Sequence, residues 1–389
     1  MKWAWRIARI AGIDVRVHVT FFVLLAWIAW ISYASAGTAA AALHGLLLVL
    51  LVFSIVILHE LGHALTARRF GIKTRSITLL PIGGVASLER MPDDPRQELL
   101  VAIAGPAVNL GLAAILAVVA VSLGQPLALG VMLESASGSV PLLTQLVWIN
   151  LALGVFNLLP AFPMDGGRVL RALLALRVSD IRATRIAAGL GQAMAVVLGI
   201  TGLFVDPLLI FIALFLWMGA SGEARLAEAK HAAHGVPVAT AMVREFEAMS
   251  PELPVAVPLR RVLETFQHDF PVVANGRVVG MLGREAMLRA LAGPGPEVPI
   301  GAVMNRDPKR VHPSDDLDDA FLQVLAQGEA LPVIDGHDRL VGVLTSESVA
   351  ELLLVREAMG ARAARGAGGS NLAAARMLEL AVGGPSPEL

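Results

Sequence analysis

The sequence predicts a polytopic α-helical membrane protein, with six transmembrane helices and a re-entrant β-hairpin, followed by a soluble α/β module. Hydrophobic residues make up 56% of the chain and charged residues only 16%, a balance typical of membrane proteins rather than soluble enzymes. The apolar residues are concentrated in long stretches before residue 230, and beyond it the charge density is that of a soluble domain. One pattern also occurs twice in that second part.

Six apolar stretches of 14 to 25 residues predict transmembrane helices, since about 20 residues of helix cross the hydrocarbon core of a bilayer. They cover residues 19–36, 43–67, 99–123, 142–159, 186–205 and 207–220. We therefore expect a six-helix transmembrane domain at residues 1–230.

The residues before the first apolar stretch favour a strand, because Ile10, Ile13, Val15 and Val17 are separated by polar or small residues. A cleaved signal peptide is the alternative, since Ala34-Ser35-Ala36 mimics a cleavage site. The strand-like pattern is unlike the n-region of a signal peptide and favours a retained first helix.

Basic residues predict the orientation in the membrane. The loops 37–43 and 124–141 contain neither Lys nor Arg, whereas the alternate loops and the segment before the first helix contain several. By the positive-inside rule, both termini of this multi-pass protein are cytoplasmic and the protein lies in the cell membrane. No basic tract suggests a nucleic acid partner, and the net charge is −1.

The segment between the second and third apolar stretches is strand-like. Residues 76–88 are apolar, but Pro81 and Gly83-Gly84 interrupt them. The segment is too short to span the bilayer, and irregular backbone at membrane depth needs surrounding protein or water. We expect a re-entrant hairpin beside the functional site; a hairpin on the membrane surface is the alternative.

A charged residue inside an apolar stretch indicates a functional site. Glu60 lies between His59 and His63 in the pattern His-Glu-x-x-His. On a helix both imidazoles share one face and can bind one zinc ion, with the glutamate beside a metal-bound water. The alternative is structural histidines with Glu60 reaching an interface, but its side chain is short and Arg68 lies two helical turns away. The chain contains no cysteine, which leaves nitrogen and oxygen ligands.

A third ligand is available at the end of the fourth apolar stretch. Pro160 and Pro163 break that helix and free Asp165 to turn inward, and glycines follow it. A catalytic zinc takes three protein ligands and keeps one position open. The alternative is that Asp165 caps the helix that follows it.

These motifs together resemble the site-2 proteases, a family of intramembrane zinc metalloproteases, and specifically their six-helix prokaryotic branch with tandem CBS domains. The resemblance rests on Leu58 to His63, on Asn157-x-x-Pro160-x-x-Pro163-x-Asp165-Gly166, on Gly83-Gly84 and on Ala104 to Asn109, and it covers nearly the whole chain.

The resemblance implies the roles of the zinc ligands and of the catalytic base. His59, His63 and Asp165 would hold one zinc ion, and Glu60 would be the catalytic base. Asn157 is a candidate second oxyanion donor, or it satisfies backbone freed by the prolines. Gly83 and Gly84 would contact the substrate, a transmembrane protein such as an anti-sigma factor or another regulator. That substrate must unwind before cleavage, and residues 76–88 could receive it as an added strand.

The duplicated pattern resembles tandem CBS domains, expected at residues 237–292 and 298–356. Met242, Pro271 and Gly280 recur as Met304, Pro332 and Gly342. This family often binds adenosine nucleotides through an aspartate in Gly-apolar-apolar-Thr/Ser-x-x-Asp. That aspartate is replaced in both copies, by Ala286 and by Ser348, so a homodimerisation or interaction role competes with nucleotide binding.

Beyond the second copy, residues 361–389 are rich in Ala, Gly and Arg and are expected to form a mobile tail. For the whole chain, two other classes of function compete with the protease. A metal transporter should show inverted repeats and polar positions at several depths, and the sequence shows neither. The intact Glu60 argues against an inactive scaffold.

Overall fold

The computed structural model describes residues 3–81, 83–88, 91–92, 94–127 and 140–365. The chain divides into two compact units, a helical unit, Met1–Ala227, and an α/β unit, Glu228–Leu389. The tail expected at 361–389 lies mostly outside the described residues. Residues 361–365 are described, as the end of helix α13 (Ser346–Arg365).

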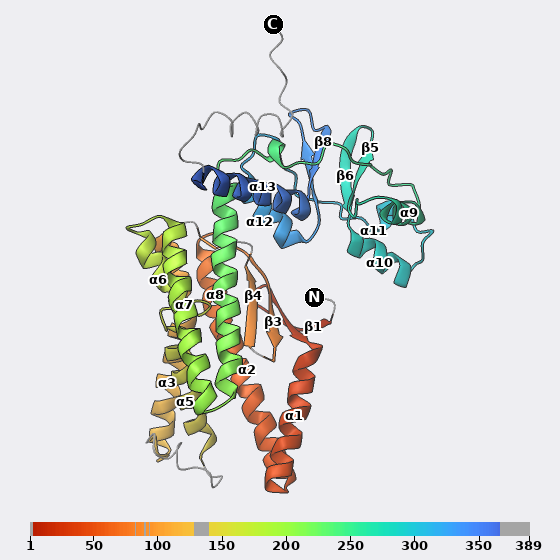
Figure 1. The fold of residues 1–389 in the computed structure, drawn as a ribbon. Coiled ribbons are helices and arrows are strands. Elements are labelled where there is room, and N and C mark those ends of the chain that lie inside the picture. The colour runs from red at the N-terminus through yellow and green to blue at the C-terminus, as the bar shows by residue number, and fades with distance from the viewer. Residues whose placement is uncertain (1–2, 82, 89–90, 93, 128–139, 366–389) are drawn as a thin grey trace. The chain divides into compact units, whose positions relative to one another are not determined.

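Seven helices are described in the helical unit, and the last of them runs past its boundary (Figure 1). They are α1 (Val19–Ala36), α2 (Ala39–Arg69), α3 (Pro95–Ser122), α5 (Leu142–Asn157), α6 (Asp165–Ala175), α7 (Asp180–Phe204) and α8 (Leu208–Ala233).

Within the described part of the chain, five helices are long and apolar enough to cross a membrane: α1, α2, α3, α7 and α8. Helix α5 is apolar but has only 16 residues. At 1.5 Å per residue it is about 24 Å long, shorter than a hydrocarbon core of about 30 Å. The polytopic helical class is therefore confirmed, and the count of six transmembrane helices stays a prediction.

A four-stranded sheet accompanies these helices, in the order β1-β2-β3-β4. Its strands are β1 (Ala4–Ile10), β2 (Ile13–His18), β3 (Thr74–Leu80) and β4 (Gly83–Leu88). The first two and the last two strands form antiparallel hairpins, whereas β2 and β3 pair in parallel. The strands predicted from the N-terminal alternation and within 76–88 are confirmed. The re-entrant position of the second hairpin stays a prediction.

One face of the sheet packs on α2. Ile13 of β2 is buried with Leu61 of α2, and Val17 is buried with Phe53 of the same helix. Because alternate residues of a strand face opposite sides, this contact leaves the polar face of β2 outward. The sheet is thus attached to the helix that contains the His-Glu-x-x-His pattern.

The α/β unit contains two similar halves. The first contains α9 (Ala256–Glu264), the hairpin of β5 (Phe270–Ala274) and β6 (Arg277–Leu282), and α10 (Arg284–Ala292). The second begins with the short α11 (Ile300–Val303) and contains α12 (Leu317–Gln327), the hairpin of β7 (Leu331–Ile334) and β8 (Leu340–Leu344), and α13.

The segment at the start of each half pairs with the hairpin of the other half. Val243 pairs with Val343 of β8 through backbone hydrogen bonds of 2.8 and 2.9 Å. Asn305 pairs with Met281 of β6 through bonds of the same two lengths. The predicted duplication, with two copies that pack together, is confirmed.

Candidate metal centre

Helices α2 and α6 bring three potential metal ligands together. His59 Nε2, His63 Nε2 and Asp165 Oδ2 lie 3.1 Å from one another in each of the three pairs. Both histidines are buried, and they lie one turn apart on α2. The triangle joins residues that are more than a hundred positions apart in the chain.

Asp165 reaches the histidines because the chain turns sharply between α5 and α6. Helix α5 ends at Asn157, and Phe162 is completely buried in the turn that follows. Met164 is the N-cap of α6, without a capping side chain, and Asp165 begins the helix with its carboxylate on the two imidazoles. Of the two roles considered for Asp165, this geometry favours the metal ligand over the cap.

The spacing of the three atoms fits a tetrahedral zinc ion. Bonds of about 2.0–2.1 Å in tetrahedral geometry place neighbouring donor atoms about 3.3 Å apart, which is close to the 3.1 Å of each pair. Two imidazoles and one carboxylate also leave a fourth position for water or substrate, as catalytic zinc sites do.

A backbone carbonyl of α3 orients one of the ligands. His63 Nδ1 lies 2.7 Å from the carbonyl oxygen of Val101, which can only accept. The proton is therefore on Nδ1, and the lone pair of Nε2 is available to a metal. His59 Nδ1 is buried without a hydrogen-bond partner among the described residues.

Gly105 of α3 provides the space in which the ligands converge. A Cβ atom at this position would lie 2.1 Å from His63 Nε2 and 2.7 Å from His59 Nε2. Any side chain here would occupy the position of the imidazoles. Gly105 belongs to one of the motifs that resemble the family, but no role could be predicted for it. Its role depends on the contact between α3 and α2, which the sequence does not show.

Strand β4 lies against Glu60. A Cβ atom at Gly84 would lie 3.0 Å from Glu60 Cγ and 2.8 Å from Val56 Cγ1. The strand approaches α2 this closely because residue 84 has no side chain. Gly83 has a φ of 139°, a conformation that favours glycine, with open space around its Cβ position. The structure thus brings Gly84 to the site and gives Gly83 a backbone role.

Ion pairs attach α6 to its neighbours. The Arg171 Nε donates to Glu98 Oε1 of α3 at 2.7 Å, and Glu98 is only 5% exposed. Arg168 pairs with Glu223 of α8 at 3.5 Å. Arg168 and Arg171 are among the basic residues from which the orientation in the membrane was predicted. They also hold the helix that presents Asp165.

Asn157 uses its side chain within its own helix. Its Nδ2 donates to the carbonyl oxygen of Leu153 at 3.0 Å. Leu153 lies inside α5, and its carbonyl is not one of those freed by Pro160 or Pro163, so this contact does not decide between the two roles considered for Asn157. The oxyanion role stays a prediction.

In both CBS copies of the α/β unit, another residue occupies the position of the ribose-binding aspartate. In the second copy, the Thr345 hydroxyl accepts from the backbone N–H of Ser348 at 3.0 Å. In the first, a Cβ at Gly283 would lie 2.8 Å from Glu329 Cγ, so the Glu329 side chain fills the space beside that position. Burial raises the pKa of the Glu329 carboxyl, against the opposing effect of its hydrogen bond from Asn305. Neither copy offers a free carboxylate where the ribose pattern requires one.

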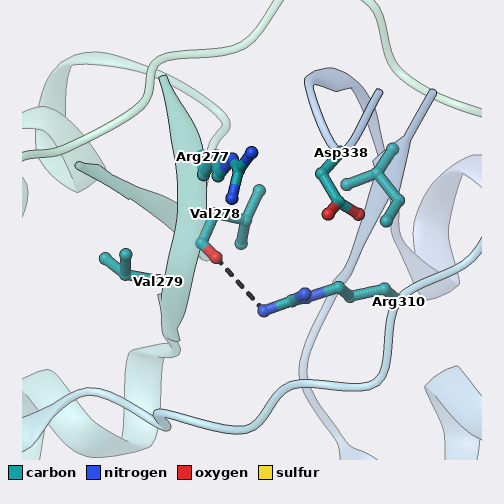
Figure 2. Close-up of a pocket in the computed structure, with 6 residues that line it drawn as sticks. Arg277, Val278, Val279, Arg310 and Asp338 are labelled. Carbon is teal, nitrogen blue, oxygen red and sulfur yellow. Dashed lines mark hydrogen bonds between the residues drawn. The ribbon is translucent and has the colours of Figure 1, made fainter. Parts of the chain in front are cut away.

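A cavity of about 250 Å³ lies at the hairpin ends of the two copies. Its lining is Arg277, Val278, Val279, Arg310, Ile334 and Asp338. Figure 2 shows Arg310 crossing the cavity to donate to the Val278 carbonyl oxygen, at 3.2 Å. Two guanidinium groups and one carboxylate suit a small anion, and the cavity lies at the opposite end of β6 from Gly283.

A second histidine and aspartate group lies at the start of the α/β unit. His234 Nδ1 lies 3.0 Å from Asp318 Oδ2 and 3.9 Å from Asp316 Oδ2. Asp316 is the N-cap of α12 and also accepts from the backbone N–H of Gly235. These contacts are those of a helix cap, so we assign this group a structural role.

Comparison with known proteins agrees with both units. Residues 47–136 and 120–200 match peptidase family M50, and residues 238–293 and 300–355 match the CBS domain. The chain is 31% identical over 359 residues to a zinc metalloprotease of Methanocaldococcus jannaschii, covering 92% of this chain and 98% of that protein. It is 30% identical over 175 residues to the stage IV sporulation protein FB of Bacillus subtilis, covering 44% and 56%. Among solved structures, it is similar to the site-2 protease from M. jannaschii, with 36% identity and a TM-score of 0.43, over 57% of this chain and 96% of that one.

The resemblance drawn from the sequence motifs is therefore confirmed at the level of the family. The relative from M. jannaschii matches almost end to end, across both the helical unit and the α/β unit. This chain belongs to peptidase family M50, the site-2 proteases, and is a multi-pass zinc metalloprotease with a C-terminal pair of CBS domains.

Proposed function

We propose that this protein is an endopeptidase that hydrolyses a peptide bond in or near a transmembrane segment of another membrane protein. The observation that carries the proposal is the convergence of His59, His63 and Asp165 at 3.1 Å, with Glu60 between the two histidines on an apolar helix. A regulator such as an anti-sigma factor is one substrate of this kind.

His59, His63 and Asp165 would hold one zinc ion through Nε2, Nε2 and Oδ2. When bound, zinc supplies a Lewis acid that polarises the scissile carbonyl and makes water more acidic. Glu60 takes the proton from the attacking water and returns it to the leaving amine. Burial of both histidines keeps the pair in a poorly hydrated setting, where each of these electrostatic effects is stronger than in water.

A substrate helix must unwind at the cleaved bond, because its carbonyl otherwise accepts an intrahelical hydrogen bond. In the sheet order β1-β2-β3-β4, strand β4 has one edge without a partner strand among the described residues. We propose that the unwound segment adds to this edge as a fifth strand. Gly84, which lies against Glu60, would then hold the added strand near the catalytic carboxylate.

We further propose that both termini are cytoplasmic and that the CBS pair regulates the protease or its assembly. The distribution of Lys and Arg among the loops supports the orientation. The replaced aspartates and the position of Glu329 argue against a ribose site, so homodimerisation through the CBS pair is the favoured role.

The Glu60→Gln variant tests the protease directly. Reconstituted in liposomes with a transmembrane substrate, it should bind one zinc ion per chain yet cleave about 10²–10⁴-fold more slowly, the usual contribution of a general base. The zinc content of the protein is measured by elemental mass spectrometry. Cleavage is measured by mass spectrometry of the peptide products. If this variant cleaved the substrate at the wild-type rate, Glu60 would be excluded as the base.

Two controls separate the alternatives. Asp165→Asn should lose both zinc and cleavage, which distinguishes a ligand from a base. A metal transporter would keep zinc flux into the liposomes when Glu60 is replaced, and flux without proteolysis in the wild type would contradict the proposal. Copurification of Glu60→Gln from its native membrane should then identify the trapped substrate.

A further inference from the structure

Strand β1 presents apolar side chains on one face and arginines on the other. Trp5 pairs with Val17, which is buried against the helices, and Arg6 pairs with Arg16 on the opposite face. Although it shares the face of a buried residue, Trp5 is 56% exposed, because β1 is the edge of the sheet. An exposed tryptophan on an amphipathic edge strand needs a partner surface.

The apolar side of β1 continues onto the first helix. The ring centroids of Trp5 and Phe22 of α1 are 5.8 Å apart, and the Val19 N–H donates to the Trp3 carbonyl oxygen at 2.9 Å. Trp3 and Ile10 are themselves 64% and 40% exposed, and Ile10 pairs with the buried Ile13 on the face that Trp5 shares. Figure 1 shows β1 at the end of α1 nearest the start of the chain. The exposed apolar surface therefore extends from β1 directly to a helix long enough to span a bilayer.

The other side of β1 and β2 is positively charged. Arg6, Arg9 and Arg16 surround the single carboxylate of Asp14, at 3.8, 3.9 and 3.4 Å. Three cations against one anion leave a net positive surface. Such a surface complements the anionic headgroups of a bilayer.

We propose that β1 is an anchor in the membrane–water interface, with Trp5 toward the acyl chains and its arginines toward anionic headgroups. The bilayer is the occupant because the strand adjoins the end of α1, and tryptophan is enriched at this depth of membrane proteins. A position beside the end of a spanning helix puts both sets of side chains within reach of lipid.

The anchor is connected to the metal centre through the sheet. One row of paired residues runs from Trp5 through Val17 and Leu79 to Gly84, which lies against Glu60. Neighbouring strands in this row are about 4.8 Å apart and hydrogen-bonded, so the sheet moves as one body. The interface depth of β1 therefore sets the depth of β4 and, resting here on the proposed function, the level at which a substrate segment is cut.

Spin labels test this placement, and the chain has no cysteine of its own to interfere. Single variants Ile10→Cys, Arg9→Cys and Phe266→Cys, each also carrying Glu60→Gln, would be labelled with a nitroxide in nanodiscs containing phosphatidylglycerol; residues 10 and 9 lie on the apolar and the charged face of β1. Phe266 is fully exposed in the α/β unit and is the water-accessible control. We expect the label at residue 10 to be accessible to oxygen and shielded from a nickel chelate, and the labels at residues 9 and 266 to be accessible to nickel.

A label at residue 10 that is as accessible to nickel as the label at residue 266 would overturn the anchor. The contacts of the arginines with headgroups are tested by exchange of phosphatidylglycerol for phosphatidylcholine, which should shift the label at residue 10 toward water. An unchanged depth of this label would remove the headgroup contacts from the proposal. Because these labels report depth in an inactive protein, their result is independent of whether the protein is a protease.

Discussion

The metal centre of the helical unit contains all the side chains that its chemistry needs, whereas the ribose positions of the CBS pair do not. In the helical unit His59, His63 and Asp165 are all present and converge at 3.1 Å. In the CBS pair, each copy pairs with the hairpin of the other copy, and two hydrophobic cores are buried. Ala286 and Ser348 nevertheless occupy the positions of the two ribose-binding aspartates. The comparison shows that packing preserves a fold, whereas chemistry survives only where particular side chains do.

The largest expected effect comes from closing the space at the metal centre. Gly105→Ala would put a Cβ atom 2.1 Å from His63 Nε2, so we expect zinc content and proteolysis to fall by at least about 100-fold. Gly111→Ala on the same helix is the matched control, because nothing lies within 4 Å of its Cβ position. Equal zinc content in the two variants would contradict the assigned role of Gly105.

The free edge of β4 gives the next largest effect. Successive N–H groups of a strand point to opposite edges, so one of Val85→Pro and Ala86→Pro removes an N–H from the open edge and the other removes one facing β3. The open-edge variant should cleave a transmembrane substrate about 10-fold or more slowly with zinc unchanged. Loss of zinc in both variants would show that β4 only supports the fold.

The same contrast explains what could be predicted from the sequence. The spacing of His59 and His63 fixes their geometry, because residues four apart share a helix face. Asp165 was found through the prolines before it, which mark the break in the helix. Gly105 and the Arg171–Glu98 pair were missed, because a glycine or an arginine in a membrane helix has several common roles. The parallel pairing of β2 with β3 joins distant segments and has no local signal.

Nucleotide binding tests the CBS pair in this comparison. We expect ATP and AMP to leave the thermal unfolding of the full-length protein unchanged, because neither CBS copy has a free carboxylate for the ribose. Ser348→Asp restores that group beside Thr345 and should introduce a nucleotide-dependent shift of a few degrees. A shift of that size in the wild type would show that the cleft binds nucleotide by other contacts.

The smallest effect concerns pH. Burial raises the pKa of Glu329, so the folded state holds its proton more tightly than the unfolded state does. The resulting stability is fully present below the usual carboxyl pKa and is lost as pH rises through the raised folded value. Glu329→Gln should therefore be slightly more stable than the wild type at neutral pH and no more stable in acid, as measured by thermal unfolding at each pH. The same difference at both pH values would point to packing instead.

The exchange of segments within the CBS pair has a consequence for folding. Val243 pairs with Val343 of β8 and Asn305 pairs with Met281 of β6, so each hairpin has one backbone neighbour that comes from the other half. A chain cut between the halves would leave each fragment with an unpaired strand edge, although each carries a full copy of the repeat. We therefore expect the duplicated module to unfold in one cooperative transition, and a nascent chain to complete the neighbours of β6 only once residue 305 has left the ribosome.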